Sequence, residues 1–383
     1  MKTVALGSVA TIDRQGVDPS SLDPTTPYLG LEHIERGGRI IGHDTVAGAA
    51  LVSTKFRFSQ KHVLYGKLRP NLGKVTRPDF DGVCSTDILP IHPGKDLDRD
   101  YLAHYLAQPS MVEFAASRTS GANLPRLSPT VLAEFQLPLP PLPEQRRIAA
   151  VLDQAETIRG KRREVLTRIE TLAQSVLAEL LAKDHFARVR LGDLIVEGPK
   201  NGLYRPASDY GSGTLIVRID SFKFGSSAIN MDCLKRVSAS TEDLAEFAVR
   251  SGDLLVNRVN SREHVGKTAL VGALDEPCVF ESNMMRIRVD CDRLLPIYAA
   301  EYMQTEDVRR QVAPMRKDAV NQSSINQADV RSLRIPLPPL DLQADFVASV
   351  EAINRQRSDS QYALAADSEL LASLQFRAFR GEL

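Results

Sequence analysis

The sequence lacks long apolar runs, paired cysteines and a net charge. No stretch reaches the roughly eighteen apolar residues that a membrane-spanning helix needs, so we expect no membrane segment. The N terminus has no apolar run of the kind found in secretory signals. The chain has only four cysteines, none in a CxxC pair: Cys84, Cys233, Cys278 and Cys291. These absences favour a cytoplasmic protein with reduced thiols. The formal net charge of 0 means that any affinity for a polyanion must come from local patches.

Catalytic motifs are also missing. The sequence contains no HExxH, no GxSxG and no complete dinucleotide fingerprint, and it has no Asn-Pro step of the kind that adenine methyltransferases use. The segment Val265–Thr268 resembles the end of a phosphate-binding P-loop, but Ser261 stands where that loop needs its first glycine. We therefore expect a reader or a scaffold rather than an enzyme, with no catalytic residue, cofactor or metal of its own.

What the sequence does contain is a near-duplication. Leu137–Leu142 reads LPLPPL, and Ile335–Leu340 reads IPLPPL 198 residues later. Each proline run follows a β-rich stretch and opens a long helical pattern. The sequence predicts an α+β protein in which two pseudo-repeated mixed α/β domains are joined by two long antiparallel coiled-coil helices. The expected boundaries are 1–143 for the first domain, 144–183 for the first helix, 184–340 for the second domain and 341–383 for the second helix.

The two long helices are predicted over Glu144–Ala182 and Asp341–Phe379. Proline is tolerated in a first helical turn, and apolar residues then recur in steps of four and three, which is typical of a coiled-coil seam. The first seam comprises Ile148, Leu152, Ala155, Leu166, Ile169, Ala173, Val176 and Leu180. Adding 198 gives seven apolar residues and Asp367. Each helix could instead fold back on its own domain. Gly160, between Arg159 and Arg162, predicts a kink or a polar crossing point.

Shorter elements are predicted inside the two domains. Apolar periodicity indicates one helix over Asp98–Arg118 and another over Ile297–Val312. Short apolar runs between turn residues indicate strands at Val63–Tyr65, Ile88–Ile91, Leu215–Ile219, Asp253–Val256 and Met285–Val289.

One basic segment stands out in the first domain. Between Thr45 and Pro78 there is no Asp or Glu, but there are seven cations: Lys55, Arg57, Lys61, Lys67, Arg69, Lys74 and Arg77. A continuing strand would place Lys67 and Arg69 on one face. Lysine suits phosphate contacts, and arginine suits bidentate recognition of guanine. A solvated basic surface is the alternative interpretation.

The second domain repeats this pattern, because a strand from Asp253 again leads to a polar turn that ends in Gly-Lys at Lys267. Arg258, Asn260 and Arg262 carry donors that could read base edges. A solvated patch has no reason to recur at the same place in both halves, so the repetition favours contact with nucleic acid.

With these motifs, the chain resembles the specificity subunit of Type I restriction–modification systems. The resemblance covers essentially the whole length. It depends on the proline runs, on VLYGKLRPNLGKV (Val63–Val75), on GDLLVNRVNSREHVGKTALV (Gly252–Val271) and on the repeated VxLG starts at Val4 and Val189. The second proline run departs from the family pattern, since Asp341-Leu-Gln-Ala replaces Pro143-Glu-Gln-Arg.

The resemblance implies two target-recognition domains that each read one half of a split, asymmetric double-stranded DNA sequence. It also implies helices that dock two methylation subunits, which bind S-adenosylmethionine and methylate adenine N6. Motor and nuclease subunits would join them, with ATP and magnesium bound in those partners. By matching position, the implied DNA contacts are Lys67, Arg69, Asn71 and Lys74 in the first domain and Arg258, Asn260, Arg262 and Lys267 in the second.

Three other hypotheses stay open from the sequence. The chain could be the recognition subunit of a Type IIB enzyme or of a phage-exclusion system. It could be a coiled-coil adaptor with no role in nucleic-acid binding. It could be a nucleotide hydrolase, if the turn at Gly266-Lys267-Thr268 bound phosphates.

Overall fold

The computed structural model describes residues 2–121, 123–223, 225–320 and 322–383. The chain divides into two compact units. Unit 1 comprises Met1–Arg163 and Tyr362–Leu383, and unit 2 comprises Glu164–Gln361. The boundaries fall inside the two long helices, so each helix contributes one half to each unit.

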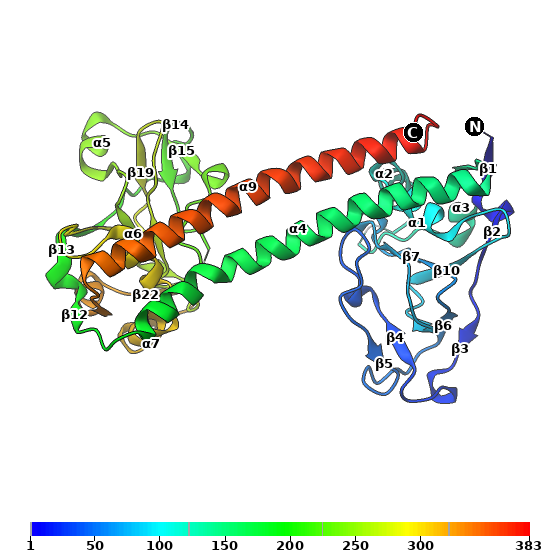
Figure 1. Cartoon of the computed structure of the whole chain (residues 1–383), viewed down its shortest axis with the longest axis horizontal. Helices are drawn as coiled ribbons and strands as arrows, with labels where there is room; N and C mark the ends of the chain where they lie inside the picture. Colours follow the sequence, from blue (N-terminus) through cyan, green and yellow to red (C-terminus); the bar gives the residue numbers. More distant parts are fainter. Residues whose placement is uncertain (1, 122, 224, 321) are drawn as a thin grey trace. The chain divides into compact units, whose positions relative to one another are not determined.

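Both long helices are present where the sequence predicts them. α4 runs over Leu142–Ala182 and α9 over Leu340–Ala378, and each is one unbroken helix (Figure 1). α4 stays helical through Gly160, where the sequence predicts a kink or a polar crossing point. Helical hydrogen bonds on either side hold the glycine, which costs only about 1 kcal/mol in a helix interior. The predicted polar crossing is present in unit 1, where Arg162 forms an ion pair with Asp367 of α9.

Within each unit the two helix halves run antiparallel. In unit 1 Arg147 donates to the carbonyl oxygen of Leu383 at 2.9 Å, and Arg162, further along α4, is paired with Asp367. The partner number falls as α4 advances, which defines the antiparallel direction. In unit 2 the late part of α4 and the early part of α9 share one core, which includes Leu177, Leu180, Phe346 and Val350.

One buried glutamine fixes the start of each long helix in the same way. Gln145 accepts from the backbone N–H of Asp98 at 2.8 Å and donates to the carbonyls of Asp96 and Pro140 at 3.0 and 2.8 Å. Gln343 repeats all three bonds, at the same lengths, with the N–H of Leu295 and the carbonyls of Arg293 and Pro338. Both side chains are fully buried. The glutamine ties the proline run to the loop that precedes the short helices of its unit.

The two units share a β scaffold. Each unit has a four-stranded sheet, with the order β2-β10-β7-β8 in unit 1 and β13-β20-β16-β18 in unit 2. Each unit also has a two-stranded ladder, β1-β11 in unit 1 and β12-β23 in unit 2. The remaining strands differ, with one five-stranded sheet, β3-β6-β9-β4-β5, in unit 1 and two three-stranded sheets, β15-β14-β19 and β17-β22-β21, in unit 2.

The strands of unit 1 are β1 (Thr3–Ala5), β2 (Ala10–Ile12), β3 (Gly16–Val17), β4 (Pro27–Leu29), β5 (Asp44–Thr45), β6 (Lys55–Phe58), β7 (Val63–Gly66), β8 (Val75–Thr76), β9 (Gly82–Cys84), β10 (Ile88–Pro93) and β11 (Gln136–Pro138). The strands of unit 2 are β12 (Arg188–Arg190), β13 (Ile195–Asn201), β14 (Tyr210–Val217), β15 (Lys235–Val237), β16 (Leu254–Asn257), β17 (Val259–Asn260), β18 (Thr268–Leu270), β19 (Cys278–Phe280), β20 (Met284–Val289), β21 (Lys317–Ala319), β22 (Gln322–Ser324) and β23 (Arg334–Pro336). The predicted strands correspond to β7, β10, β14, β16 and β20, although β14 ends at Val217 rather than at Ile219.

The single helix predicted before each proline run is in fact a pair of short helices. In unit 1 these are α1 (Arg99–Ala107) and α2 (Pro109–Ser117), separated at Gln108 because a proline excludes the helical conformation from the residue before it. In unit 2 they are α6 (Pro296–Met303) and α7 (Glu306–Met315), separated by Thr305, which caps the second helix. The other short helices are α3 (Pro129–Ala133), α5 (Thr241–Phe247) and α8 (Gln327–Ser332).

A buried tyrosine on the first helix of each pair anchors it to the scaffold. The hydroxyl of Tyr101 donates to the Pro138 carbonyl, and that of Tyr298 donates to the Pro336 carbonyl, both at 2.9 Å. Each ring packs against a phenylalanine of its own unit. Tyr101 contacts Phe379, which directly follows α9, and Tyr298 contacts Phe346 of α9. The short helices, the ladder and the long-helix halves of each unit therefore form one packed scaffold.

Candidate nucleic-acid interface

Loop 1, defined as Lys67–Gly73, follows β7 in unit 1. The predicted strand through Lys67 and Arg69 is wrong, because β7 ends at Gly66. Arg69 has a φ of 51°, and Pro70–Leu72 then form a 3-10 turn. The backbone N–H groups of Lys67 and Arg69 donate to the carbonyls of Asp87 and Pro125 at 2.9 and 2.8 Å. The bond to Asp87 extends the pairing of β7 with β10 by one residue, and the left-handed Arg69 and the 3-10 turn then lead the chain away, with the Arg69 and Asn71 side chains exposed.

Loop 2, defined as Arg258–Gly266, follows β16 in unit 2. It begins with the two-residue strand β17, which contains Asn260, and then turns through Arg262. The Arg262 side chain is 71% exposed. Arg258 and Asn260 are half-buried. A guanidinium nitrogen of Arg258 donates to the carbonyl of Ser282 at 3.2 Å, so only part of its donor capacity remains free.

Both loops are held by the same frame. In unit 1 the N–H of Gly66 donates to the Lys74 carbonyl at 2.8 Å, and in unit 2 the N–H of Asn257 donates to the Lys267 carbonyl at 2.9 Å. The glycine that ends each loop has a positive φ, 59° at Gly73 and 85° at Gly266. A Cβ at Gly73 would contact Val112 of α2 at 3.4 Å, and one at Gly266 would contact Val312 of α7 at 3.2 Å. Glycine is the residue that tolerates both constraints.

The lysine that closes each loop points inward. The ammonium of Lys74 donates to the Leu31 carbonyl at 2.7 Å. The ammonium of Lys267 donates to the carbonyls of Ile219 and Phe222 at 2.6 and 2.7 Å, lies over the Phe222 ring, and belongs to a side chain that is only 4% exposed. Burial lowers the pKa of Lys267. Both lysines are therefore engaged in supporting their loops.

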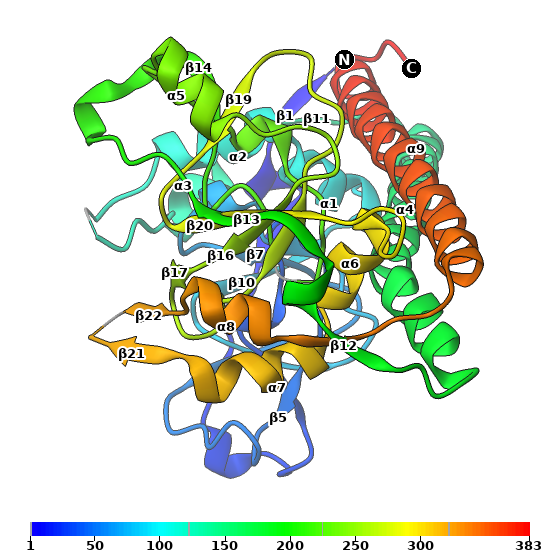
Figure 2. The same ribbon diagram turned by 90° about the vertical axis from the view of Figure 1, so that its left-hand side faces the viewer.

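A hairpin that the sequence analysis missed lies beside each loop. In unit 1 Arg126 bridges to both Leu68 and Ser120. In unit 2 β22 pairs with β17 on one side and with β21 on the other, as Figure 2 shows. Both hairpins come from polar stretches between the helix pair and the proline run. Their recurrence at the same place in the two halves is the signal that could have identified them.

The two loops differ in how their charges are balanced. Among the described residues, Lys67 and Arg69 of loop 1 have no ion-pair partner. Arg126, which bridges to Leu68 of this loop, is paired with Asp87 at 3.0 Å. Beside loop 2, Asp318 of β21 accepts from Arg316 and Ser323, both at 2.6 Å, and lies 3.9 Å from Nε of Arg262. The hydrogen bond from Arg316, followed by that from Ser323, lowers the pKa of Asp318.

The basic run of unit 1 is not one continuous patch. Lys55 is buried and donates to the carbonyl of Ser53 at 2.6 Å. Arg77 is paired with Asp153 of α4 at 2.6 Å and with Asp100 at 3.2 Å. With Lys74 also bonded to a carbonyl, the cations of the run that are exposed or half-exposed and have no such contact among the described residues are Arg57, Lys61, Lys67 and Arg69.

Three potential metal ligands, His104, Asp153 and Glu156, lie within 4.8 Å of one another in unit 1. His104 Nε2 is 2.9 Å from Asp153. The Arg77 guanidinium already supplies the positive charge beside this carboxylate. Burial alone would raise the pKa of Asp153, but the hydrogen bonds from His104 and Arg77 outweigh it and lower the pKa to about 2. The donor set fits an ion-pair network better than a metal site.

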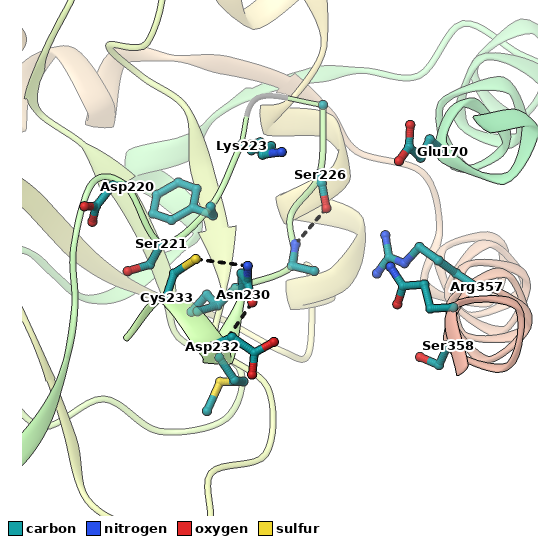
Figure 3. A pocket seen from close by; sticks show the side chains of 16 residues that line it. Glu170, Asp220, Ser221, Lys223, Ser226, Asn230, Asp232, Cys233, Arg357 and Ser358 are labelled. Atoms are coloured by element: carbon teal, nitrogen blue, oxygen red, sulfur yellow. Dashed lines mark hydrogen bonds between the residues drawn. The ribbon is translucent and has the colours of Figure 1, made fainter. Parts of the chain in front are cut away.

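Unit 2 also contains an open hollow of about 910 Å³. In Figure 3, Glu170 of α4 and Arg357 and Ser358 of α9 face a loop that carries Asp220, Ser226 and Asp232. The lining mixes charges of both signs, so it does not favour a polyanion. Among the described residues, no helix is long and apolar enough to cross a membrane.

Comparison with known proteins identifies similar sequences. Residues 1–168 match the family model described as "Type I restriction modification DNA specificity domain". The Type I restriction enzyme EcoDI specificity subunit of Escherichia coli is 35% identical over 166 residues, which cover 42% of this chain but only 37% of that protein. The EcoKI specificity subunit of Escherichia coli strain K12 is 26% identical over 316 residues, covering 76% of this chain and 67% of that protein.

Two solved structures share the fold. A chain from a study described as "Structural basis underlying complex assembly and conformational transition of the type I R-M system" matches with a TM-score of 0.61 and 23% identity, covering 100% of this chain and 98% of that one. The Type-I restriction-modification system S subunit from M. genitalium matches with a TM-score of 0.60 and 12% identity, covering 99% and 96%.

Proposed function

We propose a function from the premise that this chain belongs to the family of Type I restriction–modification DNA specificity subunits. The chain acts as the recognition subunit of such a complex. Unit 1 reads one half of a split double-stranded DNA sequence through loop 1, and unit 2 reads the other half through loop 2. Because the two loops differ in sequence, the recognised site is asymmetric.

The observation that carries this proposal is the duplicated frame. In both units the loop leaves the third strand in the order of the four-stranded sheet, ends on a glycine packed against a valine, and is closed by an inward lysine. Between these fixed points the chain differs in sequence, and it also differs in length, seven residues in loop 1 and nine in loop 2. A conserved frame around a changed loop is what two readers of different DNA sequences require.

The side chains divide into contacts and supports. We assign contact with the first half-site to Lys67, Arg69 and Asn71, of which the arginine and asparagine are exposed. We assign contact with the second half-site to Arg258, Asn260 and Arg262. The closing lysines, Lys74 and Lys267, support the loops, because carbonyl oxygens already accept from both ammonium groups.

The long helices provide the surface for partner subunits. In unit 1 the α9 half exposes Tyr362 (82%) and Phe376 (58%), and in unit 2 the α4 half exposes Leu172 (45%). Large apolar side chains at such exposure favour docking partners. We assign these surfaces to two methylation subunits, which supply S-adenosylmethionine and the chemistry at adenine N6, while this chain itself carries no catalytic role. Motor and nuclease subunits would join through the same complex.

The zero net charge makes the partners part of DNA binding as well. Protein–DNA affinity depends strongly on the number of phosphates that cations neutralise. With only a few free cations near each loop, the chain alone should bind DNA weakly, and the partner subunits should supply the remaining contacts by enclosing the duplex.

The test is selection of duplexes from a randomised library by the complex of this chain with its methylation partner. The proposal predicts enrichment of one split sequence with two specified parts. The double variant Lys67→Ala/Arg69→Ala should weaken binding and alter only one part. Unchanged affinity and unchanged enrichment in that variant would instead support a coiled-coil adaptor without a role in DNA binding.

A further inference from the structure

The carboxylate of Asp318 lies beside loop 2 but is neither one of the proposed DNA contacts nor one of the lysines that support the loops. Asp318 lies on β21, outside the loop, at the edge of the three-stranded sheet β17-β22-β21. In the register of this sheet, Asp318 is opposite Ser323, and Ser323 is opposite Asn260. Directly opposite residues of antiparallel strands share a face. The hairpin therefore brings Asp318 onto the same face as a residue assigned to DNA contact.

Asp318 is held in place by two donors. Ser323, which is 3% exposed, donates to one carboxylate oxygen at 2.6 Å, and Nε of Arg316 donates to the same oxygen at 2.6 Å. A terminal nitrogen of Arg316 reaches the second oxygen at 3.4 Å, and its other terminal nitrogen donates to the Arg262 carbonyl at 3.4 Å. Arg316 thus connects the carboxylate to the backbone of loop 2.

The second oxygen of Asp318 faces Arg262. Nε of Arg262 lies 3.9 Å from this oxygen, while the side chain as a whole is 71% exposed. Among the described residues, no partner is found for the two terminal nitrogens of Arg262. With Nε on the side of this carboxylate, the terminal N–H groups of Arg262 form a fork that matches the O6 and N7 acceptors of guanine in the major groove.

Stability does not explain this arrangement. Exposed ion pairs contribute only about 0–1 kcal/mol to folding. A negative charge near a DNA-binding loop also repels phosphates, so it lowers non-specific affinity. What the carboxylate can improve is orientation, because a long side chain that is already restrained loses less rotamer entropy when it binds.

We propose that Asp318 is a positioning residue that orients Arg262 to read a guanine in the second half-site. This inference deepens the proposed function and depends on it. Asp318 does not itself need to touch DNA. Its charge sets the direction of the Arg262 fork and discourages that arginine from pairing with a phosphate.

The experiment measures base preference at every position of the split site, using the complex with the methylation partner and a duplex library randomised in the second half-site. Asp318→Asn keeps the shape of the side chain and removes its charge. We expect the preference for guanine at one position of the second half-site to fall about tenfold, which corresponds to about 1.4 kcal/mol. The first half-site should keep its preferences.

Two further variants separate positioning from a general structural role. Arg262→Ala should abolish the preference at the same position, and adding Asp318→Asn to it should cause no further loss, because the carboxylate acts through the arginine. Asp318→Glu, which keeps the charge, should retain part of the preference. Hydrogen exchange of the β22 amides reports whether the hairpin stays folded in each variant.

A matched control is the pair of Arg236 and Glu276, which are 2.7 Å apart in the same unit and about as exposed as Asp318. Glu276→Gln should leave every base preference unchanged. An unaltered guanine preference in Asp318→Asn overturns the inference, as does a loss that is uniform over all sequences or additive with that of Arg262→Ala. A wild-type complex with no base preference at all would overturn the proposed function itself.

Discussion

Loop 1 and loop 2 occupy the same frame but differ in charge balance. Lys67 and Arg69 in loop 1 have no ion-pair partner among the described residues, whereas Arg262 in loop 2 lies beside Asp318. Unpaired cations attract phosphates of any sequence, and a restrained arginine favours a defined acceptor pair. The difference shows that one duplicated frame can hold loops of different charge, and under the proposed function we expect unit 1 to contribute more of the affinity and unit 2 more of the discrimination.

The largest expected effects test whether the buried glutamine at the start of each long helix stabilises its unit to the same extent. Gln145→Ala in unit 1 and Gln343→Ala in unit 2 each remove three buried hydrogen bonds and leave backbone groups unpaired. Each should lower the free energy of unfolding of its unit by about 3 kcal/mol. Native-state hydrogen exchange would measure the two units separately. Gln154→Ala, at an exposed position of α4, is the control and should change stability by less than about 0.5 kcal/mol. A loss of stability in only one of the two glutamine variants would contradict the view that both units are held in the same way.

The two closing lysines, Lys74 and Lys267, should contribute differently to the stability of their units. Lys267→Met removes a buried ammonium that donates to two carbonyls, and should destabilise unit 2 by about 2 kcal/mol. Lys74→Met removes one such bond from a half-exposed side chain and should cost about 1 kcal/mol. Denaturant unfolding followed by exchange in each unit provides the measurement. Equal costs would mean that burial does not distinguish the two lysines.

How much of this could be predicted from sequence depends on the range of the forces. Both long helices are confirmed within two residues at each end, because proline and the apolar repeat act locally. The departure at Asp341-Leu-Gln-Ala leaves Gln343 in place, and this residue repeats every bond of Gln145. The assignment of DNA contacts stays a prediction. The inward direction of Lys74 and Lys267 could not be read from the sequence, since their carbonyl partners lie more than forty residues away.

The missed features have the same origin. The expected strand through Lys67 and Arg69 ends early because Arg69 adopts a left-handed backbone conformation and its N–H donates to the carbonyl of Pro125, which is distant in sequence. The hairpin that carries Asp318 is short and polar, so it has none of the apolar alternation that identifies a strand. The helix break at Pro109 follows from a local rule, since a proline disfavours the helical conformation of the residue before it. The apolar positions continue on both sides of the break, however, and favour a single helix.

Salt dependence sharpens the contrast between the loops. If Lys67 and Arg69 both neutralise phosphates, Lys67→Ala/Arg69→Ala should reduce the slope of log affinity against log salt by about 2. Arg262→Ala should change that slope by about 1 at most, because it removes a single cation that lies beside a carboxylate, and should alter base preference in addition. Titration of the complex over a range of salt concentrations, with matched and mismatched duplexes, measures both quantities. Equal slopes in the two variants would contradict the division of work.

The smallest expected effect concerns pH, and it has opposite signs in the two units. The lowered pKa of Asp153 stabilises unit 1 above its ordinary pKa, and this contribution is lost as the pH falls from about 4 to about 2. Burial raises the pKa of Glu301, which accepts from Gln174 and Ser227. Its contribution is present below its ordinary pKa and is lost as the pH rises through the raised value.

Glu301→Gln should therefore flatten the pH dependence of unit 2 above about pH 4.5 by about 1 kcal/mol, and Asp153→Asn should flatten that of unit 1 only in acid. Exchange rates measured between pH 4.5 and 8 in the first variant, and thermal unfolding between pH 2 and 5 in the second, give the two profiles. A wild-type unit 2 whose stability rises with pH through Glu301 would contradict the assigned direction.

The central claim is that two independent readers each specify one half of a split DNA site. The most direct measurement replaces residues 1–137 with the matching region of a relative, expresses the complex in a host, and determines the methylated motif by sequencing the modified genome. The account predicts that one half of the motif changes and the other half, with its modified adenine, stays the same. A motif that changes in both halves, or in neither, would contradict it.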